Sequence, residues 1–246
     1  KITMKRRHFI QNTALGITAL SLFPNTLSAA INLPESELLG QGNPKLIEKN
    51  GYRLRPEASE AFEKLSAAAK KDGLRIEVVS SYRDYAHQNR IWERKFKNYT
   101  SSGLSKIAAI EKIIEYSTIP GTSRHHWATD LDIIQGGTGI TTNVLDPKKF
   151  HGNGPFCELK AWLDKYAESF GFIEVYTNDY GRKGFNYEPW HFSYAPLSTG
   201  YLNEFKKLDI THILQQKKLL GSEAFTSEFI TAYRNENILD INPKLL

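Results

Sequence analysis

The sequence has little cysteine and no apolar segment long enough to cross a membrane. Cys157 is the only cysteine among 246 residues, which excludes an intramolecular disulfide and a cysteine-rich zinc site. Because Cys157 opens an apolar helical pattern, we expect a small buried residue there, not a nucleophile. The apolar run at residues 14–23 is half of the roughly 20 residues that a bilayer requires. We therefore expect no membrane span in the mature chain.

The chain also has little excess charge outside its first 30 residues. The net charge is +5, but residues 1–30 contain four basic residues and no acidic one. The remaining chain has 28 basic and 27 acidic residues, which provides no extended field for binding phosphate groups. We therefore expect no nucleic-acid partner. The length suits one well-buried domain, or at most two small ones.

The first 30 residues have the order of an export signal. Basic residues at 5–7 precede the apolar run, and small residues at 28–30 follow it. The adjacent Arg6 and Arg7 resemble a twin-arginine signal, and an ordinary secretory signal is the alternative. We predict cleavage after Ala29 or Ala30 and a mature protein in the periplasm or outside the cell.

Hydrophobic periodicity predicts a mixture of helices and short strands in the rest of the chain. The predicted helices cover residues 56–71, 84–98, 104–116 and 156–170. The predicted strands cover residues 74–80, 129–134, 172–176 and 190–194. Because these elements lack a regular β-α-β alternation, we predict an α+β fold with a small, mainly antiparallel sheet and flanking helices.

Three further segments lack a strong pattern. Residues 31–51 contain several Gly and Pro residues and are expected to form a linker or a loosely docked arm before a domain at 52–200. The Gly- and Asn-rich residues 136–155 form a long loop, and loops of this length are often functional. Residues 201–246 contain short helical patterns and are expected to form a helical C-terminal extension.

Two short segments contain the residues with the clearest chemistry. His125 and Asp132 lie in the segment SRHHWATDLD, and Glu188 and His191 lie in the segment EPWH. Two imidazoles and one carboxylate are donors that a catalytic Zn²⁺ takes from a protein, leaving a fourth position for water. The remaining carboxylate, Glu188, is then available as a general base. Each residue alone is more often structural, but the four together predict a zinc hydrolase.

The predicted strands indicate how these side chains are directed. Asp132 lies between the apolar Leu131 and Ile133, so its side chain should point away from theirs and into a cleft on the sheet. Asp130 falls on the same face and is the alternative ligand. Glu188 is expected in the turn before the last predicted strand, from which its carboxylate can reach back over the metal.

The spacing Ser-x-His-x6-Asp, followed by Glu-Pro-Trp-His, resembles that of the VanY-type D-alanyl-D-alanine carboxypeptidases, which are zinc peptidases that trim peptidoglycan stem peptides. Residues 80–88 resemble a third motif of this family, and the resemblance covers about residues 52–196. It implies that His125, Asp132 and His191 bind zinc and that Glu188 is the catalytic base.

The resemblance also implies a substrate-binding group. Arg83 would anchor the free carboxylate of the substrate through its planar guanidinium, with help from Gln88 and Ser123. The glycine and the small residue usual in the first motif are here Ala128 and Asp130. This departure puts in question the local packing and the substrate preference, but not the metal ligands.

These observations predict a zinc-dependent carboxypeptidase that releases the C-terminal D-amino acid of peptidoglycan stem peptides, of D-Ala-D-Ala or L,D type. One alternative is a peptidoglycan endopeptidase, which needs an open cleft. Another is a non-catalytic, zinc-containing module that binds cell-wall peptides. Glu188 argues against this last alternative, because a binding site needs no base.

Overall fold

The computed structural model describes residues 33–246, and the predicted export signal at residues 1–30 lies outside the described residues. The helices in this range are α1 (Glu35–Leu38), α2 (Pro56–Lys71), α3 (Tyr85–Ser101), α4 (Lys106–Ile113), α5 (Cys157–Tyr166), α6 (Ala195–Phe205), α7 (Ile210–Gln216) and α8 (Ser227–Tyr233). The strands are β1 (Ile47–Lys49), β2 (Tyr52–Leu54), β3 (Ile76–Ser80), β4 (Asp130–Gln135), β5 (Phe172–Glu174) and β6 (His191–Tyr194).

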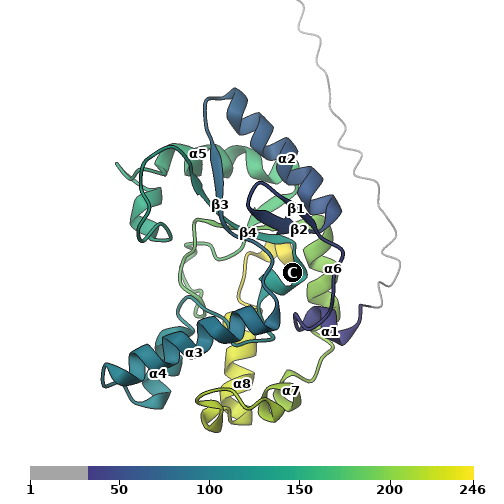
Figure 1. The fold of residues 1–246 in the computed structure, drawn as a ribbon, viewed down its shortest axis with the longest axis vertical. Coiled ribbons are helices and arrows are strands. Elements are labelled where there is room, and N and C mark those ends of the chain that lie inside the picture. Colours follow the sequence, from purple (N-terminus) through teal and green to yellow (C-terminus); the bar gives the residue numbers. More distant parts are fainter. Residues whose placement is uncertain (1–32) are drawn as a thin grey trace, which may run out of the picture. The chain divides into compact units, whose positions relative to one another are not determined.

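The strands form one small sheet and one short hairpin (Figure 1). The sheet has four antiparallel strands in the order β3-β4-β6-β5, and β1 pairs with β2 in the hairpin. With helices on both faces of the sheet, this arrangement confirms the predicted α+β class.

Most helices begin and end at residues that the sequence marks. Pro56 is the first residue of α2, and the side chain of Asp84 accepts a hydrogen bond from the backbone N–H of His87 at the start of α3. Gly171, with φ of 83°, ends the helical segment that begins with α5. The helix expected over 104–116 is shorter, because Ser105 caps α4 and the regular turns end at Ile113.

The two faces of the sheet have opposite character because side chains alternate along each strand. Leu131 and Ile133 of β4 and Phe192 of β6 belong to an apolar cluster with α2 and α5. Four polar side chains of β4 and β6 point to the other face: Asp130, Asp132, His191 and Ser193. The pairing of Asp132 with His191 and of Asp130 with Ser193 places these side chains next to one another.

Parts of residues 33–54 are packed against the rest of the described chain, although β1 is exposed. Leu38 and Leu39 are buried in the larger apolar cluster, and the indole N–H of Trp127 donates to the carbonyl of Leu38 at 3.2 Å. Glu37 pairs with Arg55 at 2.6 Å. The segment that the sequence suggests as an arm therefore contributes to the same core as the metal motif.

The C-terminal segment packs against α3 and α4. Trp92 of α3 donates its indole N–H to the carbonyl of Leu220 at 2.9 Å, and it packs against the ring of Phe225. Residues 33–246 belong to one compact unit. None of the described helices is both long enough and apolar enough to cross a membrane.

Cys157 differs from the expectation of a buried residue. It is half-buried at the first position of α5. It does not line the cavity described below. Its position therefore adds nothing to the chemistry of the site.

Candidate metal centre

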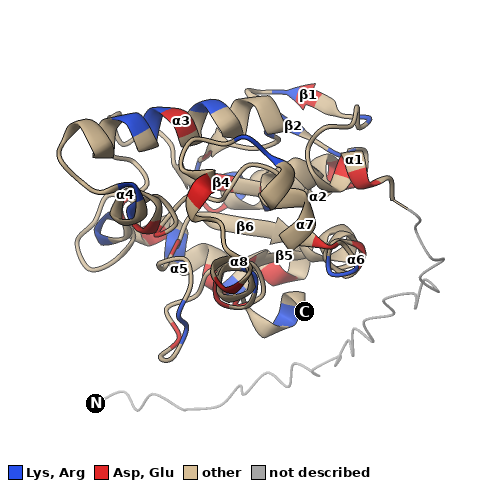
Figure 2. Ribbon diagram, turned by 90° about the horizontal axis from the view of Figure 1, so that it is seen from below, with Lys and Arg blue, Asp and Glu red and all other residues tan. Residues whose placement is uncertain are grey.

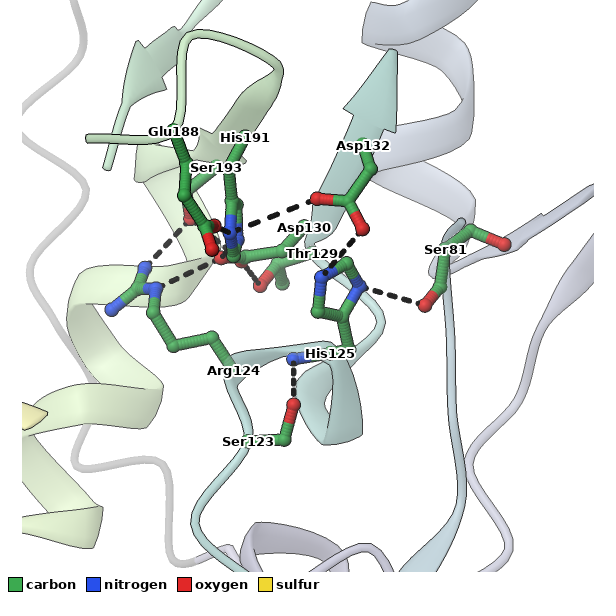
Figure 3. A network of polar contacts seen from close by, with 10 residues as sticks. All are labelled: Ser81, Ser123, Arg124, His125, Thr129, Asp130, Asp132, Glu188, His191 and Ser193. Carbon is green, nitrogen blue, oxygen red and sulfur yellow. Dashed lines mark hydrogen bonds and ion pairs between the residues drawn. The ribbon is translucent and has the colours of Figure 1, made fainter. Parts of the chain in front are cut away.

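The structure brings His125, Asp132 and His191 together on the polar face of the sheet. One ligand atom from each residue lies within 4.8 Å of the other two, and all three side chains are buried. These are the three residues that the sequence suggests as ligands. Figure 3 shows them converging from β4, β6 and the short helical turn Arg124–Trp127.

The ring of His125 is held in one tautomer. Its Nδ1 lies 2.8 Å from the backbone carbonyl of Ser81, and a carbonyl can only accept, so the proton is on Nδ1. The other nitrogen, Nε2, is the one that can bind a metal, and it lies 3.4 Å from Oδ2 of Asp132. Burial lowers the pKa of His125, which favours the neutral, metal-binding form.

Asp132 offers a carboxylate oxygen that the protein does not otherwise use. Its Oδ1 is buried without a hydrogen-bond partner among the described residues and lies 3.7 Å from Nδ1 of His191. Although burial alone would raise its pKa, the imidazole of His125 brings the pKa of Asp132 down to about 2. The carboxylate is therefore ionised and ready to bind a cation.

The donor set fits Zn²⁺ in kind and in spacing. Bond lengths of about 2.0–2.1 Å in a tetrahedral site place ligand atoms about 3.3 Å apart. Nε2 of His125 lies 3.4 Å from one oxygen of Asp132, Nδ1 of His191 lies 3.7 Å from the other, and one ligand atom from each residue lies within 4.8 Å of the other two.

His191 is oriented by Asp130, the alternative ligand, from the side away from the cluster. Oδ2 of Asp130 lies 3.0 Å from Nε2 of His191, so this nitrogen faces away from Asp132. The Asp130 carboxylate also accepts hydrogen bonds from Arg124 Nε, Ser193 Oγ and Thr129 Oγ1, at 2.7–2.8 Å. With both oxygens already bonded, Asp130 is left as a support for His191, while Asp132 faces the cluster.

The charge of Asp130 is matched by a buried arginine. Burial alone would raise the pKa of Asp130, but the guanidinium of Arg124 and the hydrogen bond with His191 hold it well below its usual range. Arg124 also donates to Ser193 Oγ at 2.7 Å. A buried ion pair of this kind is strongly destabilising to break, because one charge is left without compensation.

Glu188 lies beside the cluster, in the segment just before β6. Its Oε2 is 2.9 Å from Nδ1 of His191, and the backbone N–H of His191 donates to the carbonyl of Glu188. Burial raises the pKa of Glu188, although its contact with His191 opposes the shift. Burial alone would lower the pKa of His191, but its hydrogen bonds to Asp130 and Glu188 raise it to about 10.

The residues suggested for substrate binding lie at different depths. Arg83 and Ser123 line the same cavity as the cluster. The backbone of Arg83 is fixed on both sides, because its N–H donates to the carbonyl of His125 and its carbonyl accepts from His126 Nδ1 at 2.7 Å. Its buried Nε has no hydrogen-bond partner among the described residues.

Gln88 lies behind the cavity wall. Its side chain is fully buried and donates to the carbonyl of Thr118 at 2.9 Å. Thr118 and the neighbouring Ser117 do line the cavity, so any contribution of Gln88 to binding passes through this loop.

The cavity has a volume of about 650 Å³, within the usual range for small-ligand sites. Part of the predicted functional loop, at Asn143 and 145–147, forms one wall. Helix α3 contributes Ile91, Lys95 and Tyr99, which belong to none of the motifs in the sequence. Their spacing of four residues, which places them on one helix face, was the available signal.

Comparison with known proteins agrees with this geometry. A sequence profile described as VanY: D-alanyl-D-alanine carboxypeptidase matches residues 51–197. The chain belongs to the VanY family. A D-alanyl-D-alanine carboxypeptidase of Enterococcus faecalis is 31% identical over 149 residues, which cover 60% of this chain and 50% of the relative. A protein of the same description from Enterococcus faecium is 26% identical over 172 residues, which cover 69% and 46%. This chain thus spans about half the length of these curated relatives.

Solved VanY structures have a similar fold. VanYB in complex with D-alanine-D-alanine is 27% identical, with a TM-score of 0.52, over 72% of this chain and 92% of that chain. A glutamate-to-alanine variant of VanY from a VanB-type resistance cassette, in complex with Zn(II), is 28% identical, with a TM-score of 0.52, over 68% and 88%.

This VanY-family chain departs from the first motif at two positions. Ala128 takes the place of the usual glycine and has a left-handed φ of 58°, a conformation that costs about 1–2 kcal/mol for a residue with a Cβ. Asp130 takes the place of the usual small residue. The structure accommodates this carboxylate by surrounding it with Arg124, His191 and two hydroxyl groups.

Proposed function

We propose that this protein is a zinc-dependent carboxypeptidase that removes the C-terminal D-amino acid from peptidoglycan stem peptides. The observation that carries the proposal is the buried cluster of His125, Asp132 and His191, with Glu188 beside it and Arg83 in the same cavity. Membership of the VanY family and the names of its relatives support the same substrate class.

His125, Asp132 and His191 would hold the metal. Zn²⁺ in such a site acts as a Lewis acid and lowers the pKa of a water in its fourth position to about 7. Asp130 keeps His191 oriented for this purpose, as the carbonyl of Ser81 does for His125.

Glu188 would move the proton. A carboxylate in this position can accept a proton from the water that attacks the scissile carbonyl and return it to the leaving amine. Burial, which raises the pKa of Glu188, makes it a stronger base than an exposed glutamate. General-base catalysis of this kind contributes about 10²–10⁴-fold.

Arg83 would bind the terminal carboxylate of the substrate. Its guanidinium lies near Asp132 and Glu188, so it also offsets part of the negative charge of the site. Ser123 would assist from the cavity wall, and Gln88 would do so indirectly by holding Ser117 and Thr118. Recognition of a chain end would make the enzyme an exopeptidase.

We also propose that the protein acts outside the cytoplasm. The support is the export-like order of residues 1–30, and the polymer on which we propose it acts lies outside the membrane. N-terminal sequencing of protein from its host should find a start near Ile31. An intact N-terminus in a cytoplasmic fraction would contradict export.

Product identification tests the activity. The zinc-loaded protein is incubated with tetrapeptide and pentapeptide stems, and the released amino acid is identified by mass. We expect a single D-amino acid, and the peptide that yields it distinguishes D,D- from L,D-specificity. Glu188→Gln should retain one zinc per chain and lose turnover by at least about 10²-fold. Cleavage within cross-links would favour an endopeptidase, and undiminished turnover by Glu188→Gln would place the base elsewhere.

A further inference from the structure

Lys95 lines the cavity and has no partner there. It lies on the face of α3 that also presents Ile91 and Tyr99 to the cavity. Its side chain is half-buried, and it forms no hydrogen bond or ion pair with any residue that the structure describes. Lys97, two residues further along the helix, is exposed and pairs with Glu93 at 3.3 Å. Figure 2 shows that α3 has a single acidic segment between basic ones.

A half-buried ammonium group without a partner is costly. Burial lowers the pKa of Lys95, and the positive Arg83 adds to this effect, while Glu188 opposes it. The protein therefore does not compensate this charge fully. A negatively charged ligand that entered the cavity would do so.

The acidic groups of the cavity already have other partners. Asp132 belongs to the metal cluster, and Glu188 contacts His191 at 2.9 Å. Asp146, on the loop that also lines the cavity, accepts a hydrogen bond from the backbone N–H of Lys148 at 3.0 Å. Glu188 raises the pKa of Lys95 through its charge, but none of these carboxylates forms a hydrogen bond or an ion pair with Lys95.

Lys95 and Arg83, the cation that would bind the chain end, come from different points along the chain but line one cavity, and the charge of Arg83 contributes to the lowered pKa of Lys95. Arg83 lies just before α3, and a rise of 1.5 Å per residue carries the backbone of Lys95 about 15 Å beyond the first residue of the helix. Two cations at different points along one cavity suit a ligand with two separate negative groups. If Arg83 holds the terminal carboxylate, the second group belongs to another part of the peptide.

We propose that Lys95 binds a second carboxylate of the substrate, one carried by the part of the stem peptide that remains after cleavage. This inference rests on the proposed carboxypeptidase function, in which the leaving D-alanine has only one carboxylate, the one bound by Arg83. Two groups of a stem can supply the second: the side-chain carboxylate of a diaminopimelate residue and the α-carboxylate of a γ-linked glutamate. Lys95 would thus determine which stems the enzyme prefers.

The test combines variants with matched substrates. Three synthetic stem pentapeptides are compared: one with both carboxylates free, one with the diaminopimelate carboxylate amidated, and one with the γ-linked glutamate amidated. We expect the wild-type protein to lose about ten- to a hundred-fold in kcat/KM on one amidated peptide, mainly through KM. Lys95→Met should treat that peptide and the free one alike, and Lys95→Arg should restore the preference. Lys97→Met, the exposed control on the same helix, should behave like wild type.

Other outcomes separate this inference from the proposed function. Equal cleavage of all three peptides by the wild type, or a preference that survives in Lys95→Met, would overturn the role of Lys95 and leave the carboxypeptidase activity intact. If no stem is cleaved, the proposed function fails. Binding of the same peptides to the zinc-loaded Glu188→Gln protein, with and without Lys95→Met, then decides the role of Lys95 by calorimetry without turnover. Equal affinity of the two proteins for all three peptides would overturn it.

Discussion

Asp130 and Asp132 are two residues apart on β4 and point to the same face of the sheet, but their surroundings give them different properties. Asp130 is completely buried and is bonded by Arg124, His191, Ser193 and Thr129. Asp132 retains a buried oxygen without a hydrogen-bond partner among the described residues. The hydrogen-bond donors around each carboxylate therefore distinguish Asp130, which supports His191, from Asp132, which is a candidate ligand.

Replacement of Asp130 tests this division at the residue scale. In Asp130→Asn the side chain keeps its size, but it loses the charge that matches Arg124 and orients His191. We expect the affinity for zinc to fall about 10- to 100-fold, as measured by competition with a chelator. Because Arg124 loses its counter-charge, the free energy of unfolding should also fall. Asp179→Asn, on an exposed loop, is the control, and zinc affinity equal to that of wild type in Asp130→Asn would contradict the assigned role.

The helices around the site differ in how directly the sequence reveals them. Helices α2 and α5 cover the apolar face of the sheet, and their periodicity predicts them well. Helix α8 lies beyond the matched family region, which ends at residue 197. It nevertheless reaches the loop that leads to the first metal motif. The phenol oxygen of Tyr233 accepts from the backbone N–H of Ile119 at 3.0 Å and lies 2.8 Å from Thr122 Oγ1.

Removal of the phenol oxygen should therefore weaken this connection between elements. Tyr233→Phe leaves the N–H of Ile119 buried without a partner, which costs about 1–3 kcal/mol. For a chain of this size we expect Tm to fall by about 2–10 °C in a thermal unfolding experiment. Tyr180→Phe is a suitable control because Tyr180 is fully exposed. An unchanged Tm in Tyr233→Phe would show that α8 does not stabilise the loop through this contact.

At the scale of the whole molecule, the predictable features were those with a local cause. The alternation around Asp132 predicted which way its side chain points, and the cap at Asp84 predicted the start of α3. The period of two along a strand predicts that Asp130 and Asp132 point to the same face of the sheet, so it could not show which of them is the metal ligand. That choice depends on Arg124 and Ser193, and Ser193 lies 63 residues from Asp130.

Contacts between residues distant in sequence also determine the structure of both ends of the described chain. Residues 33–39 and the last helices share one apolar cluster with α3 and α4. Their sequences are only weakly periodic, and contacts with distant segments stabilise them. Lys95 was likewise undetected, since a lysine on a helix usually faces solvent and only the tertiary structure places this one in a cavity.

Removal of the metal should affect the whole molecule. The candidate ligands come from β4, from β6 and from the turn before β4, so a bound ion connects segments that are up to 66 residues apart. Without the ion, the imidazoles of His125 and His191 and the carboxylates of Asp132 and Glu188 must share protons in a buried space. A ligand present at about 1,000 times its Kd stabilises the folded state by about 4 kcal/mol. For a domain of this size, that corresponds to a Tm difference of about 10 °C between zinc-loaded and chelator-treated protein.

Glu188→Gln should show the same difference because it keeps the ligands, whereas His191→Ala should show little. If the wild-type protein unfolds at one temperature with zinc and with chelator, the cluster is not a zinc site.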